Sequence, residues 1–171
     1  MRGFLRAVRL LAMVVWVGGL CFFAFVVAPV AFHVLPSTHE AGLVVAGALH
    51  ALNETGPVCF FVFISATVWL SPTTDKPDKR MSRIFLSQVV MAFLMCMATF
   101  FVQWKIVPAM ERDRLAAGGD IDAAAPDNPA RLDFERLHPV SEKVEGAALF
   151  LGLGVAVLMG LERPLNEVQV E

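Results

Sequence analysis

Residues 10–35 read LLAMVVWVGGLCFFAFVVAPVAFHVL and contain no lysine, arginine, aspartate or glutamate. An uncharged apolar run of about 18 or more residues is long enough to cross the hydrocarbon core of a bilayer as one helix. The run is also longer than the apolar centre of a signal peptide, which has roughly 7–15 residues. These residues therefore predict an uncleaved first membrane span.

Three further apolar stretches follow, at about residues 41–70, 84–107 and 141–161. The 171-residue chain is 57% hydrophobic and only 18% charged, whereas about a quarter of the residues are charged in a typical soluble domain. This composition argues against a soluble enzyme and against a disulfide-stapled secreted domain. It predicts an all-α fold in which residues 1–171 form a single transmembrane domain, an integral membrane four-helix bundle.

Local signals mark where the second helix begins. Pro36 is expected to stop the first helix, and Ser37 and Glu40 form an S-x-x-E capping box at the start of the next one. Pro57 lies inside this second helix, where its missing backbone N–H is expected to produce a kink.

The third and fourth spans are separated by a long polar loop, residues 109–139. Pro108 is predicted to end the third helix, because a proline disrupts the helical hydrogen-bond pattern. Ser141 is predicted to cap the start of the fourth helix. Within the loop, residues 118–130 are rich in glycine, alanine, aspartate and proline and are expected to be mobile.

The basic residues orient the spans. Three arginines precede the first span, and the turn between the first two spans has no lysine or arginine. The positive-inside rule therefore predicts cytoplasmic N- and C-termini and an external loop between the third and fourth helices. We expect a multi-pass protein of the cell inner (cytoplasmic) membrane, with the lipid bilayer as its partner and no nucleic acid. The loop between the second and third spans carries four basic residues: Lys76, Lys79, Arg80 and Arg83.

Small residues predict how the helices pack. Gly152, Ala156 and Gly160 recur at four-residue spacing in the fourth span, and Gly18 and Gly19 lie in the first. Lipid provides no hydrophobic drive for helix association, so close backbone contact at such stripes is important. We expect packing within one chain, and a homo-oligomer through these small-residue helix faces is the alternative.

All four histidines are expected at the external end of the bundle. The candidate metal ligands among the polar residues there are His33, His50, Glu54 and His138. Imidazole and carboxylate groups are ligands of zinc, which usually binds four of them. No fixed multi-ligand motif is present, and histidines bonded to water, headgroups or backbone are the more common arrangement.

Two acidic residues lie in or near the apolar runs. Glu54 is predicted near the external boundary of the second span, and Glu145 one turn into the fourth. An ionisable group at membrane depth is costly and usually faces the bundle interior or a water-filled cavity. Glu54 is therefore either a proton or cation site or a structural acceptor beside Pro57, with Lys105 as a neutralising neighbour.

The three cysteines, Cys21, Cys59 and Cys96, lie at similar depth on three different spans, and Met91 and Met95 lie on the third. Soft sulfur ligands select Cu(I), but buried cysteine and methionine are also common core residues. No catalytic motif such as a nucleophile elbow, a phosphate-binding loop or an H-E-x-x-H helix is present. A non-enzymatic role is favoured.

Three segments resemble the transmembrane protein 205-like family (domain of unknown function 4149). Residues 14–32, VVWVGGLCFFAFVVAPVAF, match at Trp16, Gly18, Gly19, Pro29 and Phe32. Residues 103–114, QWKIVPAMERDR, match at Trp104, Pro108, Arg112 and Arg114. Residues 134–141, FERLHPVS, match at Phe134, His138 and Ser141.

The resemblance implies a small four-helix membrane protein without an assigned reaction. Members of that family often carry asparagine seven residues after the histidine, where this chain has Glu145. The Trp-Gly-Gly opening is also distantly similar to copper-resistance D-like membrane proteins and to haem-binding membrane oxidases, which implies haem or copper as cofactor.

The sequence leaves three functions open. The first is transport, metal tolerance or membrane scaffolding through the external histidine and glutamate cluster. The second is a haem- or copper-binding redox protein with His33, His50 and His138 as ligands. The third is a proton-coupled transporter subunit that acts through Glu54.

Overall fold

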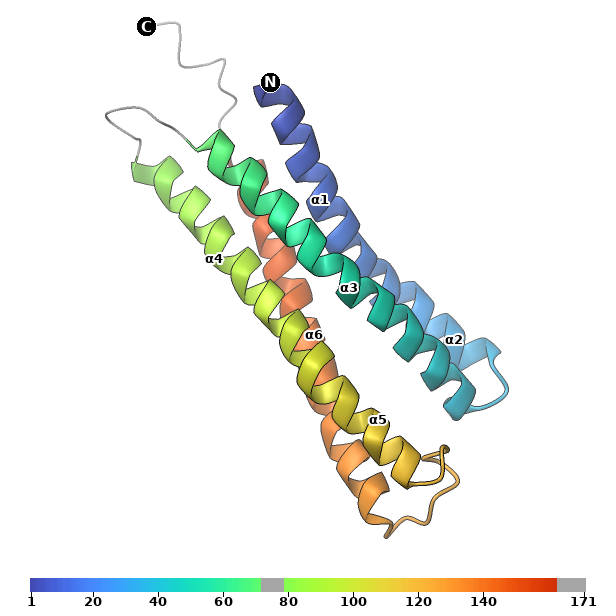
Figure 1. The fold of residues 1–171 in the computed structure, drawn as a ribbon. Helices are drawn as coiled ribbons and strands as arrows, with labels where there is room; N and C mark the ends of the chain where they lie inside the picture. The colour runs from blue at the N-terminus through green and yellow to red at the C-terminus, as the bar shows by residue number, and fades with distance from the viewer. Residues whose placement is uncertain (72–78, 163–171) are drawn as a thin grey trace, which may run out of the picture.

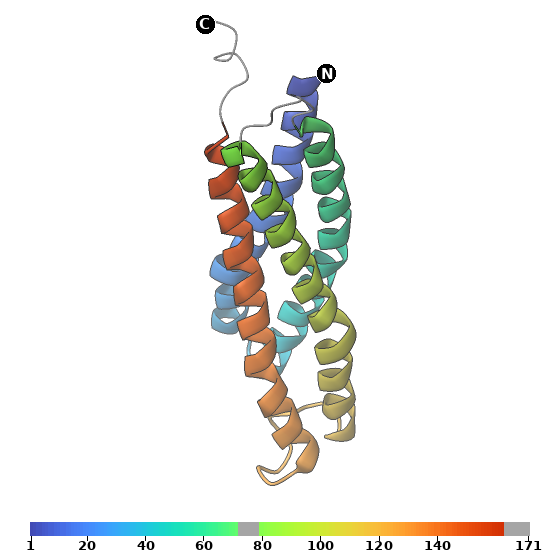
Figure 2. The same ribbon diagram turned by 90° about the vertical axis from the view of Figure 1, so that its left-hand side faces the viewer.

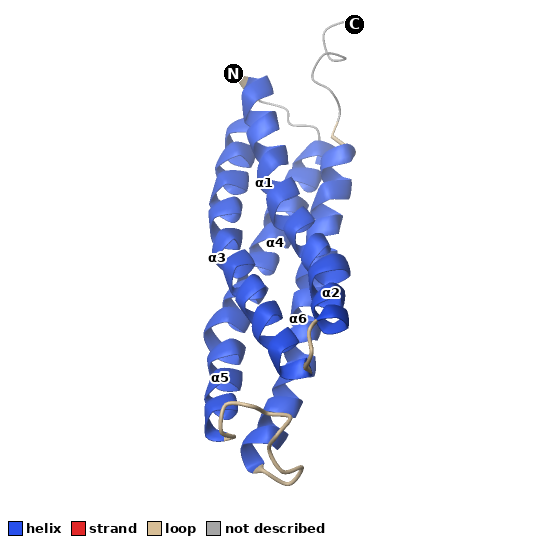
Figure 3. Ribbon diagram, turned by 90° about the vertical axis from the view of Figure 1, so that its right-hand side faces the viewer, coloured by secondary structure: helices blue, strands red, loops and turns tan. Residues whose placement is uncertain are grey.

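The computed structural model describes residues 1–71 and 79–162, and all regular secondary structure in these ranges is helical (Figures 1 and 3). Four helical rods result, and each is long and apolar enough to cross a membrane. The predicted all-α fold with four spans is therefore confirmed. The elements are α1 (Arg2–Phe22), η1 (Phe23–Val27), α2 (Ala28–Val34), α3 (Thr38–Leu70), α4 (Lys79–Phe101), η2 (Val102–Ile106), α5 (Val107–Ala116) and α6 (Pro129–Gly160).

The rods form an elongated antiparallel bundle, in which α1 packs on α3 and α4 packs on α6 (Figures 1 and 2). The start of α1, the end of α3, the start of α4 and the end of α6 lie together, and we call this the N-terminal end of the bundle. The turn from α2 to α3 and the chain between α5 and α6 lie at the opposite end, here called the loop end. Of the predicted basic loop, Lys76 falls outside the described residues.

Side-chain caps set the start of two helices. Ser37 Oγ accepts a hydrogen bond of 3.1 Å from the backbone N–H of Glu40, which confirms the predicted cap of α3. Asn128 Oδ1 accepts one of 2.9 Å from Ala130 and begins α6 well before the predicted position. The prediction that Ser141 caps this helix is wrong, because Ser141 lies inside α6 and donates its hydroxyl to the carbonyl of His138, 2.8 Å away.

Two of the prolines follow π-helical turns. Pro29 lies just after η1, and Pro108 just after η2. A proline has no backbone N–H, and its ring collides with the carbonyl four residues earlier. A π-helical turn interrupts the regular i→i−4 hydrogen-bond pattern just before each of these prolines, so the helix accommodates them. The third helix therefore continues past Pro108 to Ala116, and the prediction that Pro108 ends it is wrong.

The chain between α5 and α6 folds back on the start of α3. Thr38 donates its hydroxyl to Asp122, and His39 Nδ1 lies 3.6 Å from Asp120 Oδ1. Arg131 donates a 2.8 Å hydrogen bond to the carbonyl of Ala124. The segment 118–130 thus makes polar contacts with α3 and α6.

The bundle core is apolar along most of its axis. Its largest fully buried side chains include Trp16, Phe63 and Met95. Cys59 and Cys96 are buried in the same core, which agrees with the interpretation of these sulfurs as core residues. Gly152 allows α1 and α4 to approach α6, because an added Cβ would lie 2.6 Å from a Val17 methyl and 3.2 Å from the Met95 thioether.

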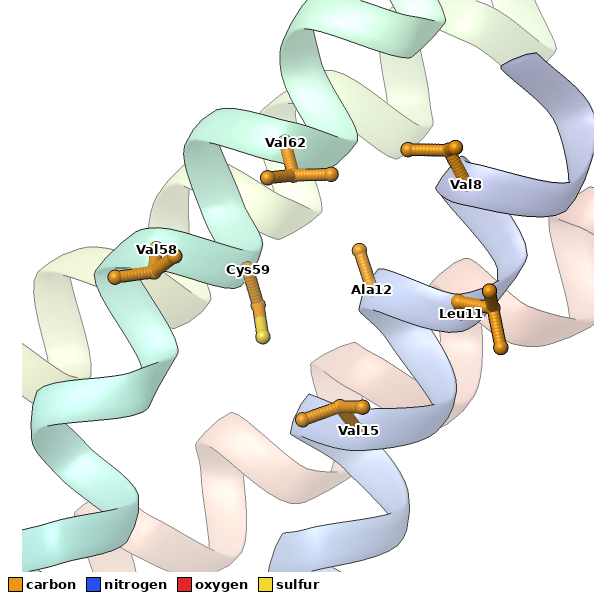
Figure 4. A pocket seen from close by; sticks show the side chains of 7 residues that line it. All are labelled: Val8, Leu11, Ala12, Val15, Val58, Cys59 and Val62. Carbon is orange, nitrogen blue, oxygen red and sulfur yellow. The ribbon is translucent and has the colours of Figure 1, made fainter. Parts of the chain in front are cut away.

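The outer surface is covered by exposed apolar side chains such as Phe25, Phe61 and Phe150. A shallow apolar groove follows the seam between α1 and α3, with Val15 and Val58 at one end and Val8 and Val62 at the other (Figure 4). A surface of this kind is compatible with hydrocarbon and unfavourable in water. The molecule is therefore a multi-pass membrane protein that presents its apolar surface to lipid.

Gly56→Ala is expected to lower the free energy of unfolding by about 1–3 kcal/mol, the usual cost of overpacking. An added Cβ would lie 2.8 Å from Nε1 and 3.2 Å from Cε2 of the fully buried Trp16 ring. Reversible unfolding in mixed detergent micelles measures the change. Gly47→Ala is the matched control on α3, since no atom lies within 4 Å of its added Cβ. Equal stabilities of the two variants would contradict close packing of α3 on Trp16.

Candidate functional site

A polar pair connects α3 and α6 inside the bundle. Asn53 is 3% exposed, and its Nδ2 donates a hydrogen bond of 3.0 Å to Glu145 Oε1. The second carboxylate oxygen, Glu145 Oε2, is buried and has no hydrogen-bond partner within residues 1–71 and 79–162. We call these two residues the Asn53–Glu145 centre. A carboxylate with one free buried oxygen has the capacity to accept a proton or to contact a cation.

The neighbouring turn of α3 explains how Asn53 is positioned. Gly56 follows Asn53 by three residues and packs directly on Trp16 of α1. Residues three apart on a helix share a face, so the contact that brings α1 against α3 also directs Asn53 into the bundle. The η2 turn, which packs against α6, carries Gln103, whose Oε1 is also buried without a partner.

Glu54 lies on the outside of α3. Its side chain is 67% exposed, and its Oε1 lies 3.2 Å from His50 Nε2. The other ring nitrogen of His50 pairs with the side-chain amide of Gln103. The structure therefore gives Glu54 a surface contact with His50 rather than a place in the interior, and it leaves Glu145 as the inward-facing acid.

The histidines are distributed over the surface. His138 Nε2 lies 3.3 Å from Glu142 Oε1, and the His138 ring stacks on Phe134 with 6.0 Å between ring centroids. His33 is exposed at the end of α2. Among the residues that the structure describes, no three or more His, Cys, Asp or Glu side chains are grouped to hold a metal ion. The predicted ligand set of His33, His50, Glu54 and His138 is therefore not brought together.

The remaining residues that the sequence singles out lie at separate places in the fold. Trp16 is 1% exposed in the core, whereas Trp104 is 70% exposed and packs on Phe100. Gly19 faces the end of the Leu52 side chain, and Gly18 has no neighbour within 4 Å of an added Cβ. Pro29 and Arg112 are both exposed, and Lys105 is exposed on η2.

A second buried polar cluster lies at the N-terminal end of the bundle. Arg9 of α1 is 3% exposed, and its Nη2 contacts Glu162 Oε2 at 2.5 Å and Oε1 at 2.6 Å. Gln88 of α4 is fully buried and donates from Nε2 to Glu162 Oε1 at 2.8 Å. The Arg9 guanidinium also lies 5.7 Å from the centre of the Phe85 ring. We call Arg9, Gln88 and Glu162 the Arg9 cluster.

The sequence does not predict this cluster, because Arg9 has the pattern of a flanking charge before the first span. One signal was available. Gln88 is a polar amide within an otherwise apolar run, and a buried amide needs hydrogen-bond partners. The partner Glu162 is 153 residues from Arg9 in the chain, so no local spacing connects them.

Comparison with known proteins gives one match. The model of the family described as "Domain of unknown function (DUF4149)" matches residues 11–114, more than half of the chain. The match includes Asn53 and Gln88 but ends before α6, which carries Glu145. No curated protein and no solved structure matches the chain. The links to transmembrane protein 205-like and copper-resistance D-like proteins stay predictions.

Proposed function

The chain belongs to the DUF4149 family, and we propose that it transports protons or small cations across the membrane through the Asn53–Glu145 centre. One observation carries this proposal. Glu145 is an acidic side chain in an apolar bundle, and in the described part of the chain only one of its two carboxylate oxygens has a hydrogen-bond partner. Ionisable groups retained at membrane depth commonly mark ion or proton pathways.

The chemistry of the pair suits reversible binding. A bare carboxylate is unfavourable in a low-dielectric interior, so it is stabilised by taking up a proton or a cation. The Asn53 amide N–H donates to Oε1 and fixes the carboxyl group, whereas Oε2 remains able to exchange its proton or cation. An uncharged amide donor suits this role, because it orients the acid in both states without neutralising it permanently.

The same proposal includes the orientation and the assembly. We place the N-terminal end of the bundle in the cytoplasm and the protein in the inner membrane. Arg2, Lys79 and Arg83 at that end support this orientation under the positive-inside rule. Large apolar side chains such as Trp16 and Phe63 fill the core of a single bundle, so we further propose that copies associate to complete a path.

Glu145→Gln is expected to reduce proton or cation flux at least tenfold, because an amide cannot release a proton or carry a negative charge. The purified protein is placed in vesicles that contain a pH-sensitive dye, and flux is measured after a potassium diffusion potential is applied. Parallel vesicles with dyes for sodium or potassium identify the transported ion.

Two matched variants make this test specific. Glu142→Gln changes an exposed acid one turn earlier on α6, and Glu54→Gln removes the other candidate acid, which is also exposed. Both variants are expected to retain flux. If Glu145→Gln folds and transports as well as the parent protein does, the proposed function is wrong.

A further inference from the structure

The Arg9 cluster is separate from the Asn53–Glu145 centre. It lies at the N-terminal end of the bundle and joins α1, α4 and Glu162, the second residue after the end of α6 (Figure 1). The proposed transport step uses none of its members. A guanidinium that is 3% exposed in a membrane bundle is costly, and such residues are usually retained for a specific partner.

The cluster has more hydrogen-bonding capacity than Glu162 uses. An arginine side chain carries five N–H donors, and Arg9 uses only Nη2 for Glu162. Its Nε and Nη1 are buried and have no hydrogen-bond partner among the residues that the structure describes, and the same holds for Gln88 Oε1. The site thus combines one positive charge with free donors and one free acceptor.

The carboxylate that occupies the site is not part of a helix. Glu162 follows the end of α6 at Gly160, and its backbone N–H makes only a turn hydrogen bond of 3.3 Å to Met159. Its side chain is 12% exposed, whereas that of Arg9 beneath it is 3% exposed. Glu162 is therefore the more exposed of the two side chains, and its displacement would break only this turn hydrogen bond of the backbone and none within α6.

We propose that Arg9 and Gln88 form a carboxylate-binding site, which the chain's own Glu162 occupies and a small carboxylate ligand enters by replacing it. Guanidinium and carboxylate are matched in geometry and form strong charge-assisted hydrogen bonds. In the cluster itself, one guanidinium and one neutral amide compensate a single negative charge, which fits a carboxylate better than a doubly charged phosphate.

The test is rescue of a variant by acetate. Glu162→Ala leaves Arg9 without its counterion, and we expect the melting temperature in detergent to fall. Acetate at 100 mM is expected to raise this melting temperature by about 2–4 °C relative to chloride at equal ionic strength, because a ligand that binds only the folded state stabilises it. The parent protein is expected to show a smaller rise, which needs a higher acetate concentration, since acetate must first displace Glu162 from Arg9.

Further variants and lipids separate the alternatives. Glu142→Ala removes an exposed acid of α6 and should show no acetate effect, and Arg9→Met/Glu162→Ala should lose the rescue. The melting temperature of Glu162→Ala is also compared in micelles with phosphatidylserine, whose headgroup carries a carboxylate, and with phosphatidylglycerol, whose headgroup carries none. A higher melting temperature with phosphatidylserine shows that a headgroup carboxylate also fills the site. If Glu162→Ala does not fold, Glu162→Gln replaces it in the same titration. An equal response to acetate and chloride, or a rescue that survives Arg9→Met, overturns the proposal.

Discussion

Truncation of Trp16 to alanine is expected to lower the free energy of unfolding by about 3–5 kcal/mol, the usual cost of removing a large buried aromatic side chain. The Trp16 ring is 1% exposed, packs directly on Gly56, and meets Phe60 edge-on at 6.5 Å between ring centroids. Its removal leaves a cavity between α1 and α3, because lipid cannot enter a space enclosed by helices. Equilibrium unfolding in mixed micelles, followed by circular dichroism, measures the loss.

The other two tryptophans provide matched controls. Trp69, near the end of α3, and Trp104, on η2, are each 70% exposed. Alanine at either position exchanges a lipid or interface contact for a similar one, so a change within about 0.5 kcal/mol is expected. If Trp16→Ala costs no more than Trp69→Ala does, the Trp16 ring does not hold α1 against α3.

The architecture was predictable because lipid imposes a simple rule on the sequence. A span cannot contain many charges, so the gaps between charged residues revealed four helices that the structure confirms. Helix ends were less predictable, because they depend on local geometry. Pro108 was expected to end a helix that instead continues through the η2 turn, and Asn128, not Ser141, caps α6.

Of the two residues of the centre, the sequence singles out Glu145 but not Asn53. Asn53 and Glu54 are neighbours on α3, and successive residues on a helix point about 100° apart because a turn contains 3.6 residues. One of them therefore faces the bundle while the other faces outward. A charge in an apolar run drew attention to Glu54, yet the Trp16–Gly56 contact turns Asn53 inward and leaves Glu54 exposed.

Arg9 illustrates a different difficulty. Arginines at the edge of a span are normally interpreted as anchors at the cytoplasmic surface, and Arg2 fits that pattern because it is exposed. Arg9 lies two turns further along α1 and is buried against α4. Its burial depends on Glu162, at the opposite end of the described chain, and this tertiary contact has no signature in the local sequence.

Replacing Arg9 by methionine is expected to lower the free energy of unfolding by about 3–5 kcal/mol, the cost of removing one member of a buried ion pair. Methionine retains an unbranched apolar stem, so most of the loss comes from the Glu162 carboxylate and the Gln88 amide, which lose their partner. Arg6→Met is the control, because Arg6 lies on the same helix and forms no ion pair with the described residues. Its effect should stay within about 0.5 kcal/mol.

The double variant Arg9→Met/Glu162→Met separates charge pairing from packing. A buried ion pair is often replaceable by apolar side chains at little cost, so the double variant is expected to recover most of the stability that Arg9→Met loses. The recovery measures the coupling between the two residues. If the double variant does not recover stability, the ion pair does not hold the end of α6 against α1, and packing alone holds the N-terminal end of the bundle together. If stability is recovered, replacement of Glu162 by another carboxylate changes how firmly α1 and α6 are joined.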